Sequence, residues 1–178
     1  GDVLIGLPSA GVHSNGYSLV RKIVNHVGLA YTDEAPFEAE HPGRDLMRWT
    51  EGKATLGEVF LTPTRIYCDP VVDLLNAARG GEDFGIEDVH GICHITGGGL
   101  SNLLRLHPSL GWDIHTPLPV LPEFKWLQSA GGVETREMYR TFNMGMGMVI
   151  AVDAARSDAV LRWLKARMPE AAVVGHVR

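Results

Sequence analysis

Residues 8–16 combine side chains that could bind an anion with one that could carry a proton. The segment reads Pro-Ser-Ala-Gly-Val-His-Ser-Asn-Gly and offers two hydroxyl groups, an amide and the imidazole of His13. Because imidazole titrates near neutral pH, His13 could exchange a proton with a ligand or orient it. The alternative is a loop histidine with no chemical role.

The elements around this segment suit anion binding. An apolar strand over 3–7 precedes it, and an amphipathic helix over about 17–27 follows it. The first turn of a helix leaves backbone N–H groups unpaired at the positive end of the dipole, and glycines let a ligand approach them. We therefore expect ligand contacts from Ser9, Gly11, Ser14, Asn15 and Gly16. Ser14 and Asn15 could also cap the helix.

A second junction of the same kind follows the strand predicted over 89–95. Thr96 and the triplet Gly97-Gly98-Gly99 lead into a short leucine-rich helix. Consecutive glycines occur where backbone must lie against a ligand or other backbone, although a tight turn is the simpler alternative. Ligands of open α/β sheets sit at the carboxyl ends of strands, so we expect the two loops to enclose one anionic ligand. His94 is then a substrate contact or a core hydrogen-bonding group.

Further polar residues extend the candidate site. The Arg65 guanidinium, next to Thr64, could pair with phosphate or form a structural salt bridge. Asn143 precedes an apolar, methionine-containing strand. Strand alternation puts Cys93 on the face opposite His90 and His94, so these residues cannot close around one zinc ion, and we predict no metal site.

Composition excludes several classes of protein. The 178 residues hold 16 Lys and Arg against 21 Asp and Glu, a net charge of −5, with no basic run. Nucleic acid is therefore not an expected partner. No apolar run reaches the length of a membrane span, and two cysteines suit a reducing cytoplasm. The length suits one domain over 1–178, and Gly1 in place of Met suggests a piece of a longer protein.

Alternating strands and helices predict a layered α/β (α+β) sandwich, in which helices flank a mixed β-sheet. The periodicity predicts strands over 3–7, 89–95, 112–115, 145–152 and 173–177, and helices over 17–27, 69–79, 122–130, 134–140 and 155–168. Asp69 is expected to cap the second of these helices, and a further helical turn is expected near 45–49.

The motifs together resemble the C-terminal domain of the phosphoribosylformylglycinamidine cyclo-ligases, also called aminoimidazole ribonucleotide synthetases. The likeness is carried by His13-Ser14-Asn15-Gly16-Tyr17-Ser18, by 62–67, 94–99, 137–143 and 145–148, in the order expected for that family. The chain departs from the family pattern at Ala10 and Val12, where Ser and Pro are common, and just after the glycine triplet.

This resemblance implies an ATP-dependent ring closure in de novo purine biosynthesis. ATP activates the formyl oxygen of formylglycinamidine ribonucleotide, and closure gives aminoimidazole ribonucleotide, ADP and phosphate. His13 would be the acid/base or orienting residue. The implied substrate-binding residues are Ser9, Gly11, Ser14, Asn15, Gly16, Thr64, Arg65, His94, Thr96, Gly97, Gly98, Gly99 and Asn143.

The same resemblance implies that an N-terminal domain binds most of the ATP and Mg²⁺ and forms the main contact of a homodimer. This chain alone is then not expected to turn over ATP. Two alternatives remain open: another ATP-dependent member of the superfamily, such as a thiamine-phosphate kinase, and a non-catalytic module that binds phosphate or nucleotide.

Overall fold

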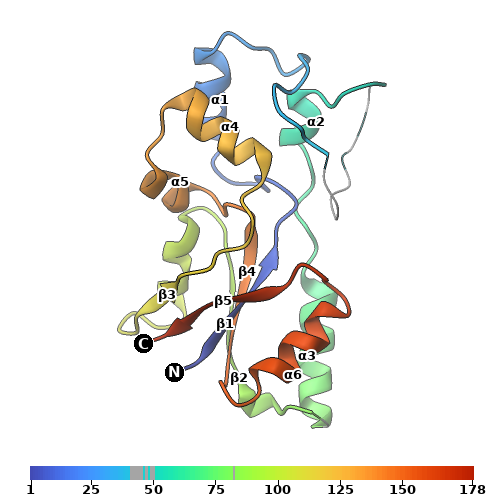
Figure 1. Cartoon of the computed structure of the whole chain (residues 1–178), viewed down its shortest axis with the longest axis vertical. Coiled ribbons are helices and arrows are strands. Elements are labelled where there is room, and N and C mark those ends of the chain that lie inside the picture. Colours follow the sequence, from blue (N-terminus) through green and yellow to red (C-terminus); the bar gives the residue numbers. More distant parts are fainter. Residues whose placement is uncertain (41–45, 47, 49–50, 82) are drawn as a thin grey trace.

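The chain folds around one five-stranded antiparallel sheet (Figure 1). The computed structural model describes residues 1–40, 46, 48, 51–81 and 83–178. The strands lie in the order β2-β4-β1-β5-β3. They span Val3–Pro8 (β1), Val89–His94 (β2), Trp112–Ile114 (β3), Met146–Val152 (β4) and Ala172–Val177 (β5). The helical turn predicted near 45–49 lies outside the described residues.

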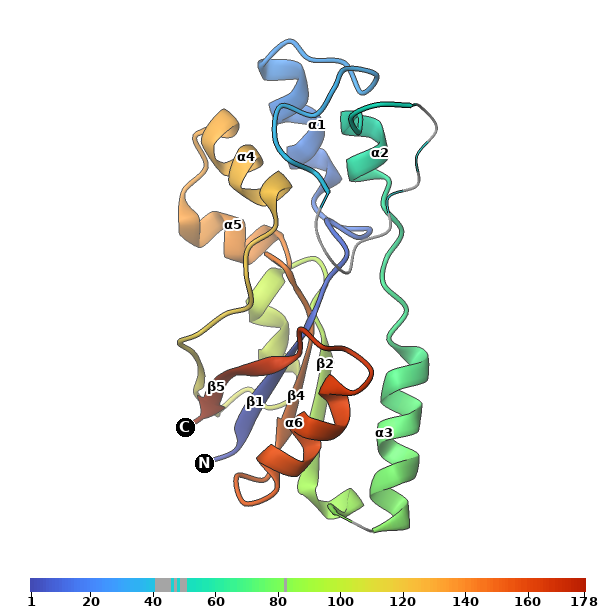
Figure 2. The same cartoon turned by 45° about the vertical axis from the view of Figure 1, so that its right-hand side comes forward.

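The two faces of the sheet are covered by different elements. Helices α3 (Cys68–Gly80) and α6 (Ser157–Lys165) lie side by side on one face (Figures 1 and 2). Ile5 and Ile150 face this helical layer, while Leu4 and Val149 face the opposite side and the 3₁₀ helix η2 (Gly99–Arg105). Alternate residues of a strand point to opposite faces, so both faces of the central strands are apolar.

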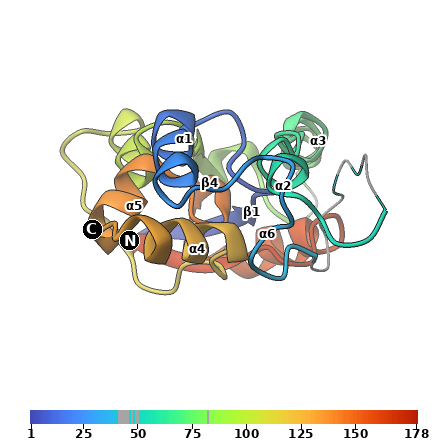
Figure 3. The same cartoon turned by 90° about the horizontal axis from the view of Figure 1, so that it is seen from above.

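A second group of helices lies beyond the end of the sheet at which β1 finishes. It contains α1 (Tyr17–His26), α2 (Leu56–Phe60), α4 (Pro122–Gly131) and α5 (Thr135–Thr141), as seen from that end in Figure 3. These helices share a core that includes Ile23, Phe60, Phe124 and Phe142. The polar loops therefore lie between this helical group and the sheet.

The layered α+β prediction is confirmed, but the mixed sheet is wrong, because every pairing is antiparallel. β1 and β2 do run in the same direction, as strand–helix alternation suggests. However, β4 lies between them and pairs with both: Met148 is opposite Leu7 on one side and His94 on the other. The carboxyl ends of β1 and β2 thus lie at one edge of the sheet, on either side of the start of β4.

Several predicted boundaries shift in the structure. The residues after the glycine triplet form a 3₁₀ helix rather than an α-helix. Helix α3 begins at Cys68 after Tyr67, so Asp69 lies in its first turn and does not cap it. Helix α4 begins at Pro122 and ends before Gly132, as predicted. The short 3₁₀ helix η1 (Ile86–Asp88) leads into β2.

Gly147 in β4 tests how closely the Tyr67 side chain packs against the sheet. A Cβ atom at this position would collide with the Tyr67 hydroxyl. We expect Gly147→Ala to lower the free energy of unfolding by about 1–3 kcal/mol, because Tyr67 would have to move. Gly80→Ala is the matched control, since a Cβ there meets nothing within 4 Å. Urea unfolding measures both variants, and equal stability would contradict the expected collision.

Candidate functional site

The loop over 8–16 is held from one side by Asn143. The Ser9 hydroxyl donates to Asn143 Oδ1 at 2.8 Å, and the Gly145 N–H donates to the same oxygen at 2.9 Å. Asn143 Nδ2 donates to the carbonyl oxygen of Gly11 at 2.8 Å. Ser9 and Asn143 are both buried, so their hydrogen bonds hold the loop in place.

The segment over 62–67 holds the same loop from the other side. The Tyr67 hydroxyl donates to the Pro8 carbonyl at 2.7 Å, and the Arg65 N–H points to His13 Nε2 at 3.4 Å. The hydroxyl groups of Ser14 and Thr64 lie 3.3 Å apart. Burial raises the pKa of the Tyr67 phenol, so this group stays protonated and remains a donor.

The first turn of α1 keeps its positive end accessible. Gly16 precedes the helix with a φ of 78°, and no side chain among the described residues caps it. The alternative that Ser14 or Asn15 caps the helix is therefore wrong; Ser14 is exposed and Asn15 half-buried. No acidic residue lies in the first turn of α1. Its N–H groups and dipole favour an anion there.

The second loop is organised by Asn102, which is buried. Its Oδ1 accepts from the Thr96 hydroxyl at 2.8 Å and from the Thr96 N–H at 3.3 Å, and its Nδ2 donates to the Gly97 carbonyl at 3.2 Å. Asn102 is not among the predicted site residues; the only signal in the sequence is an amide shortly after the triplet. Thr96 therefore uses its hydroxyl within the loop.

The three glycines have different surroundings. A Cβ at Gly99 would collide with the Tyr139 carbonyl, so Gly99 is required for backbone packing against α5. Gly97 is exposed and Gly98, with a φ of 103°, is half-buried. A Cβ at Gly97 would lie 3.2 Å from Asn15 Oδ1. The two glycine-containing loops therefore meet, as predicted, at Asn15 and Gly97.

A shallow cavity of about 280 Å³ lies where the end of β2 faces the 62–67 segment and the start of α3. His94 and Arg65 line it, and the His94 ring lies 5.6 Å from the Tyr67 ring and 6.4 Å from the His13 ring. The other lining residues are Tyr67, Cys68, Val71 and Met148. Tyr67 and Cys68 are not among the predicted site residues. Tyr67 belongs to the same polar segment as Thr64 and Arg65, whereas the type of Cys68 gave no signal that it would line a cavity.

The predicted site residues thus divide into two sets. The accessible set consists of exposed or half-buried residues: Ser14, Asn15, Gly16, Thr64, Arg65, His94, Thr96, Gly97 and Gly98. The supporting set is buried beneath it: Ser9, Gly11, His13, Gly99 and Asn143. Only the accessible set has side chains or backbone exposed to solvent.

His13 belongs to the supporting set. Burial lowers its pKa to about 4, with further contributions from His94 and Arg65. Its Nε2 accepts from the Ala10 N–H at 3.0 Å. At neutral pH the imidazole is therefore uncharged.

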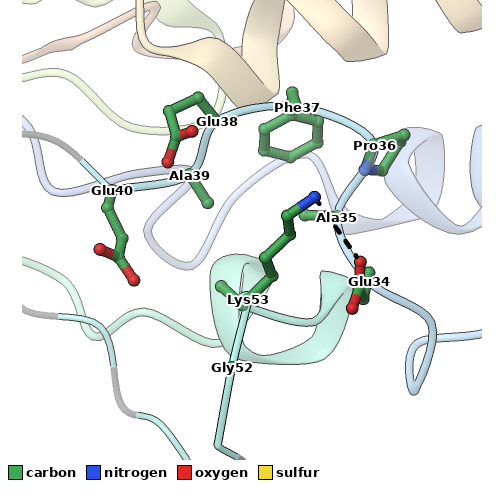
Figure 4. Close-up of a pocket in the computed structure, with 10 residues that line it drawn as sticks. Glu34, Ala35, Pro36, Phe37, Glu38, Ala39, Glu40, Gly52 and Lys53 are labelled. Carbon is green, nitrogen blue, oxygen red and sulfur yellow. Dashed lines mark ion pairs between the residues drawn. The ribbon is translucent and has the colours of Figure 1, made fainter.

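Another cavity lies elsewhere, next to α2 (Figure 4). It has a volume of about 610 Å³ and is lined by Glu34, Glu38 and Glu40 together with Lys53, whose Nζ lies 4.0 Å from a Glu34 oxygen. Three carboxylates against one ammonium disfavour an anionic ligand. A cavity of about 470 Å³ between Arg65 and Arg167 is also lined by Asp69, Asp73 and Glu170.

Within the described residues, no group of three or more His, Cys, Asp or Glu side chains is arranged to hold a metal ion. No helix in the described part of the chain is long and apolar enough to cross a membrane.

The low pKa of His13 makes stability depend on pH. Its pKa is about 4 in the folded chain against an ordinary 6.5, so the unfolded chain binds the proton more tightly. The free energy of unfolding therefore has its full value above pH 6.5. Up to about 3 kcal/mol of it is lost as the pH falls toward 4. His13→Gln should show a correspondingly weaker fall in unfolding free energy over this range. Parallel pH dependences in denaturant titrations of the two proteins would contradict this.

Comparison with known proteins agrees with this geometry. Residues 1–178 match the family described as AIR synthase related protein, C-terminal domain. The phosphoribosylformylglycinamidine cyclo-ligase of Methanosarcina barkeri is 44% identical over 163 residues, which cover 90% of this chain and 42% of that protein. The enzyme of the same name from Methanosarcina mazei is 45% identical over 150 residues, covering 84% and 38%. The chain spans about two fifths of the length of these relatives. It belongs to the AIR synthase related proteins, as a C-terminal domain of that family.

Proposed function

We propose that this chain is the substrate-binding half of a cytoplasmic ATP-dependent cyclo-ligase that converts formylglycinamidine ribonucleotide into aminoimidazole ribonucleotide. The names of the two Methanosarcina relatives support the reaction. The observation that carries the proposal is the meeting of the two loops at Asn15 and Gly97, together with Arg65 and His94, which line one cavity. No observation favours a thiamine-phosphate kinase or a non-catalytic module.

The accessible set suits a ribonucleotide monophosphate. The uncapped start of α1 and the Arg65 guanidinium favour the phosphate group, because both offer N–H donors and positive charge. Asn15 and the backbone of Gly97 and Gly98 offer donors and acceptors for the amide and ribose. Positioning of the formyl carbon near the attacking nitrogen is then the main contribution of this half.

ATP and Mg²⁺ are assigned to another part of the enzyme. The described residues hold no cluster that fits a divalent cation, so we derive no step through Mg²⁺ on this chain. We propose that an N-terminal domain supplies these ligands and the contacts of a homodimer. This division leaves the chain with the formylglycinamidine ribonucleotide as its own ligand.

The reaction itself is tested on the full-length protein that carries this chain. With ATP, Mg²⁺ and formylglycinamidine ribonucleotide, we expect aminoimidazole ribonucleotide and ADP to form in equal amounts. Thiamine phosphate in place of the ribonucleotide should give no ADP. The 178-residue chain alone is expected to release no ADP in a coupled assay. Turnover by the chain alone, or ADP release only with thiamine phosphate, would refute the proposal.

The role of Arg65 gives a test at residue level. Removing a charge-assisted contact to phosphate costs about 1.5–3 kcal/mol, so Arg65→Ala should lower kcat/KM for the ribonucleotide by about 10–100-fold. Arg79→Ala is the matched control, since Arg79 lies in the last turn of α3 and contacts Asn76. Steady-state kinetics distinguish them. Equal kcat/KM in the two variants would remove Arg65 from the site.

A further inference from the structure

The backbone of His13 has a conformation that bulky residues rarely adopt. Its φ is +58°, in the left-handed region that favours glycine, asparagine and aspartate. The neighbouring Gly11 and Gly16 also have positive φ values. Histidine adopts this conformation more readily than most residues with a Cβ, and its side-chain contacts then help to hold the loop.

Those contacts go through a single ring nitrogen. Nε2 of His13 accepts the N–H of Ala10 at 3.0 Å, within its own loop, and faces the N–H of Arg65 at 3.4 Å. Arg65 lies in the segment that also reaches the loop through Tyr67 and Thr64. Nε2 of His13 thus fixes the shape of the 8–16 loop and the position of this loop against the 62–67 segment.

These contacts determine where the imidazole proton is. A nitrogen that accepts an N–H must be unprotonated, so the neutral ring carries its proton on Nδ1. Nδ1 is buried, and no acceptor among the described residues lies within hydrogen-bonding distance. Cε1, next to Nδ1, faces β4, where a Cβ at Gly147 would lie 3.0 Å from it. Neither ring nitrogen of His13 can therefore contact a ligand that is bound by the accessible set.

The surroundings of the ring also keep it neutral. His94 and Arg65 face it from β2 and from the 62–67 segment, and Tyr67 lies 6.2 Å away between ring centres. Burial and these two groups lower the pKa to about 4. A base with this pKa is poorly matched to proton abstraction near neutral pH.

We infer that His13 is a positioning residue, whose Nε2 fixes the 8–16 loop against the 62–67 segment, and that it transfers no proton during the reaction. The second half of this inference rests on the proposed cyclo-ligase function. Asn15 and Arg65 are the groups positioned, because both lie on backbone that the His13 contacts fix.

Two substitutions separate positioning from acid/base chemistry. In His13→Gln the side-chain oxygen can take the place of Nε2, whereas in His13→Asn it takes the place of Nδ1. Neither side chain can shuttle a proton at neutral pH. Asparagine tolerates positive φ better than glutamine, so a loss confined to His13→Asn cannot come from backbone strain.

The kinetics of the full-length protein decide between the two roles. We expect kcat/KM to be about tenfold higher in His13→Gln than in His13→Asn, as the loss of one to two backbone hydrogen bonds requires. The pH profile of His13→Gln should keep the shape of the parent's. A general base would instead lose about 10²–10⁴-fold in both variants. Equal activities in the two variants, whether low or high, would overturn the inference.

Measurements that do not depend on enzyme activity also test the positioning role of His13. The ¹⁵N chemical shifts of labelled histidine should show an unprotonated Nε2 and a protonated Nδ1 near pH 6.5. The Ala10 and Arg65 amides should exchange slowly with solvent in the parent and in His13→Gln, and faster in His13→Asn. A protonated Nε2 would overturn the inference. If the protein forms no aminoimidazole ribonucleotide, the proposed function fails, and these shifts and exchange rates still decide the positioning role.

Discussion

The structure depends on how the polar backbone over 8–16 is satisfied where it leaves the sheet beneath a layer of helices. Buried N–H and carbonyl groups that lack partners cost more than most packing contacts contribute. Asn143 meets this constraint, because its amide accepts from Ser9 and Gly145 and donates to Gly11. An aspartate could accept but could not donate to the Gly11 carbonyl. The amide type is therefore a requirement of the fold.

This constraint links the sheet to the helical group that contains α1 and α5. Asn143 directly precedes the turn into β4 and follows α5, while Ser9 directly follows β1. The Ser9 N–H also donates to the Gly145 carbonyl at 2.9 Å, which extends the β1–β4 pairing by one step beyond the sheet. The position of α1, and with it the accessible helix start, is fixed by the same few bonds. The geometry of the candidate site and the stability of the fold thus depend on the same residues in this part of the molecule.

The sequence predicts the helices and strands well. It predicts poorly which residues of the candidate site are buried and which are accessible. Apolar periodicity located every strand and most helices, because burial on one face imposes that pattern. It could not place β4 between β1 and β2, since strand order depends on contacts between distant segments. Residue type marked His13, Ser9 and Asn143 as polar residues near a ligand. Which of them would be buried depends on distant segments such as 62–67, which local patterns cannot place.

Glycine shows why residue type alone is ambiguous here. Gly99 is needed because the Tyr139 carbonyl leaves no room for a side chain, whereas Gly97 is exposed beside Asn15. Both lie in one triplet, yet of these two only Gly97 has backbone that a ligand could reach. The same separation applies to the histidines: His94 lines the cavity, and His13 is buried behind it. A buried layer that fixes the backbone lets a few exposed groups bind with little loss of conformational entropy. The chemical role of a residue in this fold follows from the layer in which it lies.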